Sequence, residues 1–149
     1  MHILILNGPN LNRLDLRKPE IYGSKSMAQI LLDIQKRWPD VHFVYRQSNH
    51  EGDLIDWIQE ANDNRSPLTD NRYQGIVLNA GGYSHTSVAL RDAVEECEVP
   101  VVEVHISDIT KREPFRQKSL LTEVCAHTII GHGTNGYEEA IEYIIATAN

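Results

Sequence analysis

The sequence predicts an α/β fold in which helices cover both faces of a five-stranded parallel sheet. Five short apolar runs, rich in valine, isoleucine and leucine, alternate with segments that carry apolar residues at helical spacing. The runs contain few polar residues, as expected for strands that are buried on both faces. A composition of 41% hydrophobic and 23% charged residues is typical of a globular protein.

The first elements are bounded by clear stop signals. A strand at residues 2–6 leads into residues 7–23, where glycine and proline predict a long loop. A loop of this length is often functional, and its polar ends suit a lid that closes over a ligand. Ser26 and Gln29 have the spacing of a capping box, which predicts a helix that ends at Pro39.

The later elements continue the alternation, with a turn-rich loop at residues 62–72. Further strands are predicted at residues 41–45, 75–78, 100–107 and 128–130. Amphipathic helices are predicted around residues 54–61, 88–94 and 140–145. A flavodoxin-like three-layer sandwich, built as one domain over residues 1–149, fits this length and number of elements.

Charge and cysteine usage exclude several classes of protein. The net charge is -7 and no cluster of lysine and arginine is present, so nucleic acid is not expected as a partner. Cys97 and Cys125 are isolated and indicate reduced, packed thiols, and no spacing suggests a zinc site. No signal peptide or long apolar run is visible. We therefore expect a cytoplasmic protein without a membrane partner.

The fourth predicted strand carries the clearest candidate for chemistry. Side chains on a strand alternate between faces, so Glu103 and His105 share one face near its carboxyl end. Open α/β sheets bind their ligands outside the carboxyl ends of the strands. A structural ion pair is the alternative, but the polar Ser107 and Arg112 that follow favour a functional site.

Polar side chains also follow two other strands. Asn10, Arg17 and Tyr22 come after the first strand, and Asn79 and His85 come after the third. If the strand ends converge, these groups line one crevice with the residues of the fourth strand. For Asn79 and His85, hydrogen bonding within their own loop explains the residue types equally well.

The glycines near the end of the chain call for a separate interpretation. Gly131, Gly133 and Gly136 have the spacing of a dinucleotide-binding fingerprint and precede a helix. They follow the last strand, however, which leaves no room for a further βαβ unit. We therefore interpret them as turn and close-packing residues.

Several of these segments resemble the type II 3-dehydroquinate dehydratases. The matching segments cover nearly the whole chain in the order of the family: Asn7–Asn12, Arg17 before Pro19, Tyr22-Gly23, Gln47–Gly52, Asn79–Leu90, Val101–Ser107, Phe115-Arg116 and Gly131–Tyr137. The resemblance implies a flavodoxin-like fold and a lyase of the shikimate pathway that makes precursors of aromatic amino acids. The implied substrate is 3-dehydroquinate, which loses water without a cofactor or metal to give 3-dehydroshikimate.

The resemblance also implies catalytic roles. Tyr22 would take a proton from the carbon beside the substrate ketone, with Arg17 as the neighbouring cation that lowers the phenol pKa from about 10. Polar groups near Asn10 would stabilise the resulting enolate. His105 would then protonate the departing hydroxyl, and Glu103 would orient its ring.

The remaining implied roles concern binding and assembly. Ile106 and Ser107 would hold the substrate carboxylate, whereas Asn79, His85 and Arg112 would hold its ring hydroxyls. Asp92 resembles a residue that this family contributes to a neighbouring subunit. The resemblance therefore implies a homo-oligomer, a dodecamer built from trimers.

Three single residues depart from the family pattern, and Gln117-Lys118 replaces a frequent basic or histidine pair after Arg116. Asp15 replaces a usual lid glycine, Lys18 replaces a usual acid, and Asp108 replaces a usual asparagine beside Ser107. A carboxylate at position 108 would oppose anion binding unless it points away or is paired. Two alternatives follow: a dehydratase whose Asp108 shifts specificity to a related hydroxy acid, and a non-catalytic flavodoxin-like module that binds a flavin or a small carboxylate.

Overall fold

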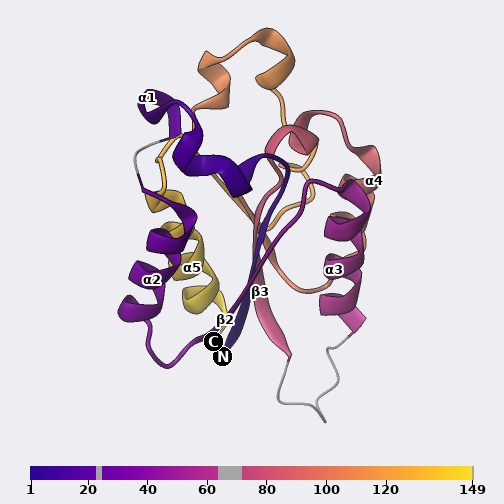
Figure 1. Cartoon of the computed structure of the whole chain (residues 1–149). Helices are drawn as coiled ribbons and strands as arrows, with labels where there is room; N and C mark the ends of the chain where they lie inside the picture. Colours follow the sequence, from indigo (N-terminus) through magenta and orange to yellow (C-terminus); the bar gives the residue numbers. More distant parts are fainter. Residues whose placement is uncertain (23–24, 64–71, 149) are drawn as a thin grey trace.

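The computed structural model describes residues 1–22, 25–63 and 72–148, with Tyr22 described by its backbone alone (Figure 1). Five strands form one sheet in the order β2-β1-β3-β4-β5, and all neighbouring pairs are parallel. The strands are β1 (His2–Asn7), β2 (His42–Gln47), β3 (Tyr73–Asn79), β4 (Val101–His105) and β5 (His127–Ile130). This order is that of the flavodoxin-like fold, so the predicted architecture is confirmed.

The long helices form a layer on each face of the sheet. Figure 1 shows α2 (Met27–Arg37) and α5 (Asn135–Thr147) on one face, and α3 (Glu51–Asp63) and α4 (Val88–Glu96) on the other. Alternation along the strands builds both cores. In β1, Ile3 and Ile5 pack in the core with α2 and α5, whereas Leu4 and Leu6 pack in the core with α3 and α4. This explains why the strand sequence is apolar throughout.

The predicted capping box at the start of α2 forms only in part. The Ser26 side chain accepts a hydrogen bond from the Gln29 N–H group at 3.2 Å, as predicted. The return bond from the Ser26 N–H group to the Gln29 side-chain oxygen is not found among the described residues, and the amide nitrogen of Gln29 donates to Asp33 at 2.8 Å. The start of α4 is capped in the same way: the Ser87 side chain accepts a hydrogen bond from the Leu90 N–H group.

The segment after β1 is more ordered than the predicted loop. It contains a 3₁₀ helix, η1 (Leu11–Leu16), and a short α-helix, α1 (Pro19–Tyr22). Leu11 and Leu14 are both buried in the core, one on each side of a kink at Arg13, where the backbone leaves helical geometry. The abundance of asparagine, glycine and proline conceals these helical turns in the sequence.

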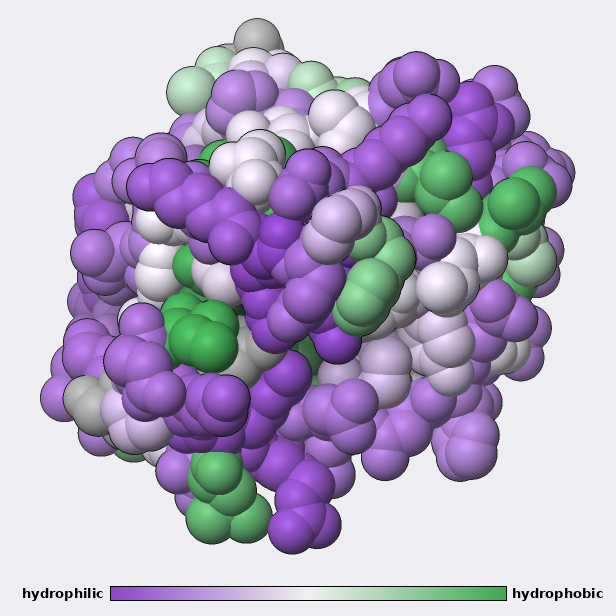
Figure 2. All heavy atoms as spheres, turned by 90° about the horizontal axis from the view of Figure 1, so that it is seen from above, coloured by the Kyte–Doolittle hydropathy of each residue, from purple (hydrophilic) through white to green (hydrophobic). Residues whose placement is uncertain are grey.

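Short 3₁₀ helices follow β3 and β4 at the same edge of the sheet. They are η2 (Gly81–His85), η3 (Ile109–Lys111) and η4 (Pro114–Arg116). With η1 and α1 they form the upper end of the molecule in Figure 1, and Figure 2 shows that this face is mainly hydrophilic. The predicted loop at residues 62–72 lies largely outside the described residues.

The late glycines have the structural roles that the sequence predicts. Gly131 and Gly133 have positive φ angles of 78° and 62°, where a side chain would be strained. A Cβ atom on Gly136 would lie 3.1 Å from Val104, so this glycine allows close packing of α5 on the sheet. In the described part of the chain, no helix combines the length and the apolar character needed to cross a membrane.

Candidate active site

A cleft of about 430 Å³ opens where β1, β3 and β4 end. Seven of the residues that the sequence singles out line it: Arg17, Asn79, His85, His105, Ile106, Ser107 and Arg112. Leu11, Gly81, Gly82, Ile109 and Arg116 complete the lining. The site lies next to the point between β1 and β3 where the strand order reverses, the usual place for a ligand in this type of sheet.

His105 is held from behind by a buried carboxylate. Its Nε2 atom lies 2.7 Å from Oε2 of Glu103, and both side chains are almost inaccessible to solvent. Three hydroxyl groups also donate to this carboxylate: Ser119 to Oε2, and Thr122 and Thr128 to Oε1 at 2.7 and 3.0 Å. The predicted pair on one face of the strand is therefore present.

These hydrogen bonds determine the charge of Glu103 and the orientation of the His105 ring. Burial raises the pKa of Glu103, but hydrogen bonds and charge interaction with His105, together with the hydroxyl donors, outweigh burial and lower it. An ionised carboxylate can only accept, so Nε2 of His105 carries a proton. The opposite ring nitrogen, Nδ1, has no hydrogen-bond partner among the described residues, and the ring lines the cleft.

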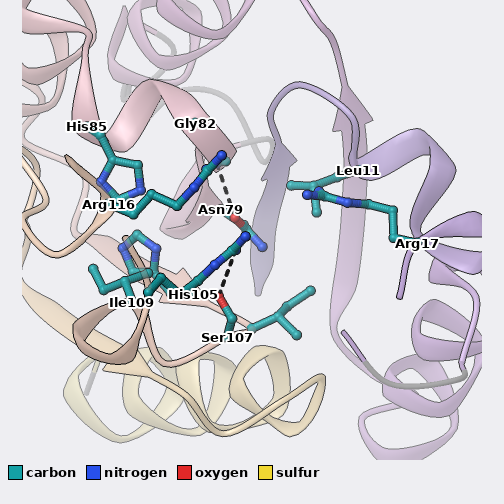
Figure 3. A pocket seen from close by; sticks show the side chains of 12 residues that line it. Leu11, Arg17, Asn79, Gly82, His85, His105, Ser107, Ile109 and Arg116 are labelled. Atoms are coloured by element: carbon teal, nitrogen blue, oxygen red, sulfur yellow. Dashed lines mark hydrogen bonds between the residues drawn. The ribbon is translucent and has the colours of Figure 1, made fainter. Parts of the chain in front are cut away.

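His85 lies beside His105 on the same side of the cleft (Figure 3). Their ring centroids are 6.3 Å apart and the ring planes differ by 29°. Nδ1 of His85 lies 2.8 Å from the Lys118 carbonyl oxygen, which can only accept, so Nδ1 carries the proton. In a neutral ring this leaves Nε2 able to accept a hydrogen bond from a hydroxyl group.

Three arginines surround the opening. Arg112 donates to the Ser107 hydroxyl oxygen at 3.4 Å, and Arg17 extends from η1 on the opposite side (Figure 3). Arg116 is a lining residue that the sequence reasoning did not select. It is placed by η4, by a 2.6 Å bond to Glu113 and by its position over the Phe115 ring. The sequence did contain a clue to Arg116, because the Phe115-Arg116 pair matched the family pattern. That match alone gave Arg116 no role.

Four other predicted site residues do not line the described cleft. Glu103 is behind His105, and Asn10 lies in an adjoining hollow that it shares with Arg17. Asp92 is exposed on α4, where its nearest ionic partner is Arg91 at 4.0 Å. The side chain of Tyr22 lies outside the described residues, as do Gly23 and Ser24.

Asp108 is not among the residues that line the cleft, but it lines an adjoining hollow with Ile106, Ser107 and Arg112. Its carboxylate accepts hydrogen bonds from the Thr110 N–H group and hydroxyl at 3.0 and 2.5 Å, and Lys111 lies 3.9 Å away. The bonds from Thr110 and the charge of Lys111 lower the pKa of Asp108. The Asp108 carboxylate is therefore paired. Such pairing is one of the two conditions, named above, under which Asp108 would not oppose anion binding at Ser107.

The lining defines the chemistry that the cleft can perform. Three guanidinium groups and a serine hydroxyl suit a carboxylate ligand, and the amide of Asn79 with His85 suits hydroxyl groups. His105, oriented by a buried anion, is suited to proton transfer. Neither a lysine nor a carboxylate is among the described residues that line the cleft.

Comparison with known proteins gives one consistent result. The sequence pattern of the family described as "Dehydroquinase class II" matches residues 1–145. A 3-dehydroquinate dehydratase of Exiguobacterium sp. (strain ATCC BAA-1283 / AT1b) is 47% identical, over 97% of this chain and 94% of that protein. The 3-dehydroquinate dehydratase of Bacillus subtilis (strain 168) is 45% identical over 97% and 94%.

Solved structures agree with the sequence comparison. The crystal structure of type II dehydroquinase from Butyrivibrio crossotus DSM 2876 superposes with a TM-score of 0.88 at 40% identity, covering 97% of both chains. That of Propionibacterium acnes gives 0.87 at 35% identity, covering 97% of this chain and 96% of the other. With its strand order and its oriented histidine in a cationic cleft, this chain belongs to the class II dehydroquinase family.

Proposed function

We propose that this protein is a 3-dehydroquinate dehydratase, which removes water from 3-dehydroquinate to give 3-dehydroshikimate in the shikimate pathway. The observation that carries the proposal is the His105–Glu103 pair at 2.7 Å in a cleft lined by three arginines. The substrate is a cyclic carboxylate with a ketone and several hydroxyl groups. Such a molecule needs an anion subsite, hydroxyl-binding groups and proton transfer, and the cleft has residues for each.

The substrate carboxylate binds at Ile106 and Ser107. The main-chain N–H groups of these residues have no acceptor within the described part of the chain. The Ser107 hydroxyl oxygen already accepts from Arg112, so its own proton is free to be donated to the ligand. Asn79, His85 and Arg112 hold the ring hydroxyls, and Arg116 adds a fourth charged or polar contact from the same side.

Proton removal is assigned to Tyr22 and Arg17. A phenol with a pKa of about 10 becomes an effective base only when a nearby cation stabilises the phenolate. The guanidinium of Arg17, which lines the cleft, supports this assignment. Loss of the substrate proton gives an enolate, which polar groups near Asn10 stabilise from the adjoining hollow.

Proton delivery is assigned to His105. The proton that leaves as part of water comes from Nδ1 of the imidazolium, because Nε2 donates to Glu103. The ionised Glu103 stabilises the charged ring before transfer and keeps its orientation afterwards. The elimination is anti, with Tyr22 and His105 on opposite faces of the substrate ring, and the same groups act in reverse for hydration.

Assembly and location are part of the same proposal. We expect one catalytic domain in a cytoplasmic homo-oligomer, a dodecamer built from trimers, in which Asp92 reaches the site of a neighbouring subunit. The exposure of Asp92 on α4 leaves it available for such a contact. Light scattering that gives the mass of a monomer would contradict this assembly.

A direct assay tests the activity. Addition of 3-dehydroquinate is expected to produce the ultraviolet absorption of the conjugated ketone in 3-dehydroshikimate. Borohydride added with substrate is expected to leave the enzyme active, because no lysine lines the described cleft to form an imine. Ligand binding without turnover would instead support a non-catalytic binding module.

The Tyr22→Phe variant tests the proposed base. We expect turnover to fall by at least about 10²-fold, the usual range for loss of a general base. Tyr143→Phe is the control, because its hydroxyl bonds the Ala126 carbonyl and Tyr143 is not among the residues that line the cleft. A Tyr22→Phe enzyme with the rate of the control variant would remove Tyr22 from the mechanism.

A further inference from the structure

A second group of polar side chains lies beneath the cleft, and of its members only Asn79 has a role in the proposed chemistry. Tyr137, in the first turn of α5, is fully buried; its hydroxyl donates to Oδ1 of Asn7 at 2.7 Å and accepts from Nδ2 of Asn79 at 3.0 Å. Asn7 in turn donates through Nδ2 to the Tyr45 hydroxyl at 3.2 Å. The chain of bonds therefore joins the ends of β1, β2 and β3 to α5.

One backbone group sets the direction of all these bonds. The Gly81 N–H group, which can only donate, bonds Oδ1 of Asn79 at 3.2 Å. The amide nitrogen of Asn79 must then face Tyr137, whose hydroxyl accepts that bond and gives its own proton to Asn7. The orientation of the Asn79 amide is thus fixed from two sides, by Gly81 and by Tyr137.

The buried hydroxyl is suited to this task because it keeps one proton. Burial raises the pKa of Tyr137 far above that of a free phenol, so the hydroxyl is neutral at any physiological pH. A neutral hydroxyl has a single donor, and here that donor is used by Asn7. The Tyr137 hydroxyl oxygen can therefore act toward Asn79 only as a hydrogen-bond acceptor.

Of the four side chains in the chain of bonds, only that of Asn79 also lines the described cleft. An asparagine amide has two N–H donors and two acceptor lone pairs, and the contacts to Tyr137 and Gly81 use one of each. The second N–H and the second lone pair remain for a ligand hydroxyl. Which of them faces the ligand depends on the orientation that Tyr137 and Gly81 impose.

We propose that Tyr137 is a positioning residue, which acts through Asn79 to set the donor and acceptor that the cleft presents to a substrate hydroxyl. The inference rests on the proposed function, in which Asn79 binds the substrate. Tyr137 itself does not line the described cleft, so its effect must reach the substrate through Asn79. A contact that binds the substrate and the transition state equally well affects KM and leaves kcat nearly unaltered. We expect the contact between Asn79 and the substrate hydroxyl to be of this kind.

The Tyr137→Phe variant removes only the hydroxyl. We expect KM for 3-dehydroquinate to rise about fivefold to tenfold while kcat stays within about twofold of wild type. Tyr45→Phe is the matched control, since it removes the hydroxyl at the other end of the chain of bonds and leaves the Tyr137–Asn79 contact in place. Its KM should stay within about twofold of wild type.

A double-mutant cycle separates positioning from general stabilisation. In an Asn79→Ala background, Tyr137→Phe should raise KM by less than about 1.5-fold, because the group that it positions is gone. A full additional rise in that background would show that Tyr137 acts on the fold at large and would overturn the proposal. So would a wild-type KM in the single variant.

Two further measurements keep the test decisive. If Tyr137→Phe does not yield folded protein, Asn7→Ala keeps the phenol but removes its acceptor, and the same rise in KM with the same dependence on Asn79 is expected. Turnover by the wild-type enzyme tests the proposed function independently. An active wild type with an unchanged Tyr137→Phe variant would refute the positioning role alone.

Discussion

The two walls of the cleft are built on different principles. The wall that carries His105 begins on β4, all five residues of which are buried, and its Glu103 accepts four hydrogen bonds from three separate segments. The wall that carries Arg17 consists of a six-residue 3₁₀ helix and a four-residue α-helix. Helices this short are not stable alone, so that wall depends on the burial of Leu11 and Leu14.

The difference suggests how the work of catalysis is divided. A proton donor is most effective when its orientation is fixed before the substrate arrives, because no reorganisation is then needed during the reaction. The β4 wall meets this requirement through its buried hydrogen bonds. On our proposal that Tyr22 is the base, we expect it to approach after the ligand binds, as a residue on a closing lid would. The following predictions test this contrast.

The largest expected effect is that of His105→Ala. If His105 is the general acid, as we propose, its loss should lower kcat by about 10²–10⁴-fold. The matched control is His132→Ala, which removes another histidine that bonds a carboxylate, that of Glu139 at 2.5 Å, from an exposed position that is not among the cleft residues. The control should keep nearly full activity. Comparable losses in both variants would mean that the β4 wall has no special role.

A smaller effect is expected for Arg116→Ala. Loss of a charge-assisted hydrogen bond costs about 1.5–3 kcal/mol, which corresponds to a rise in KM of roughly 10–100-fold. Arg37→Ala is the control, because Arg37 pairs with Glu138 and Glu142 at the surface between α2 and α5. Steady-state kinetics that leave KM unchanged in Arg116→Ala would exclude this arginine from substrate binding.

The smallest predicted effect concerns stability and its dependence on pH. The pKa of Glu103 lies below its usual value of 4.5, so its bonds stabilise the fold fully above that pH and progressively less as the pH falls further. Glu103→Gln should lower Tm at pH 7 by roughly 3–10 °C. The difference in Tm between wild type and Glu103→Gln should become smaller in acid. Thermal melting at several pH values between 7 and 3 can measure this difference.

The control for this prediction is Glu139→Gln, which changes an exposed carboxylate. Its melting curves should follow those of wild type at each pH. A gap between wild type and Glu103→Gln that widens in acid would show that the buried carboxylate destabilises the fold, which is contrary to our assignment.

The sequence predicts those parts of the molecule in which residue types repeat at short, regular intervals. Alternation by two places Glu103 and His105 on one face, and strand–helix alternation gives the sheet. The family motifs identify most of the cleft residues. In contrast, η1 was predicted as a loop because a 3₁₀ turn has a weak pattern among asparagines and prolines.

Contacts between distant residues could not be predicted. Ser119 and Thr122 reach Glu103 from a segment that has no periodic pattern, and Thr128 reaches it from the neighbouring strand β5. Tyr137 bonds Asn7 across 130 positions, and this contact depends on how α5 lies on the sheet. Such partners depend on the packing of whole elements, which no local pattern of residue types encodes.

The arginines around the cleft have a consequence for how quickly a ligand arrives. The chain has 21 acidic and 14 basic residues, so an anion in solution is repelled by the protein as a whole. The cleft gathers three guanidinium groups and two imidazoles with no lining carboxylate among the described residues, so it concentrates attraction at its mouth. Diffusing dianions and monoanions are thereby guided to one place, and added salt, which shortens the range of this field, should slow their capture.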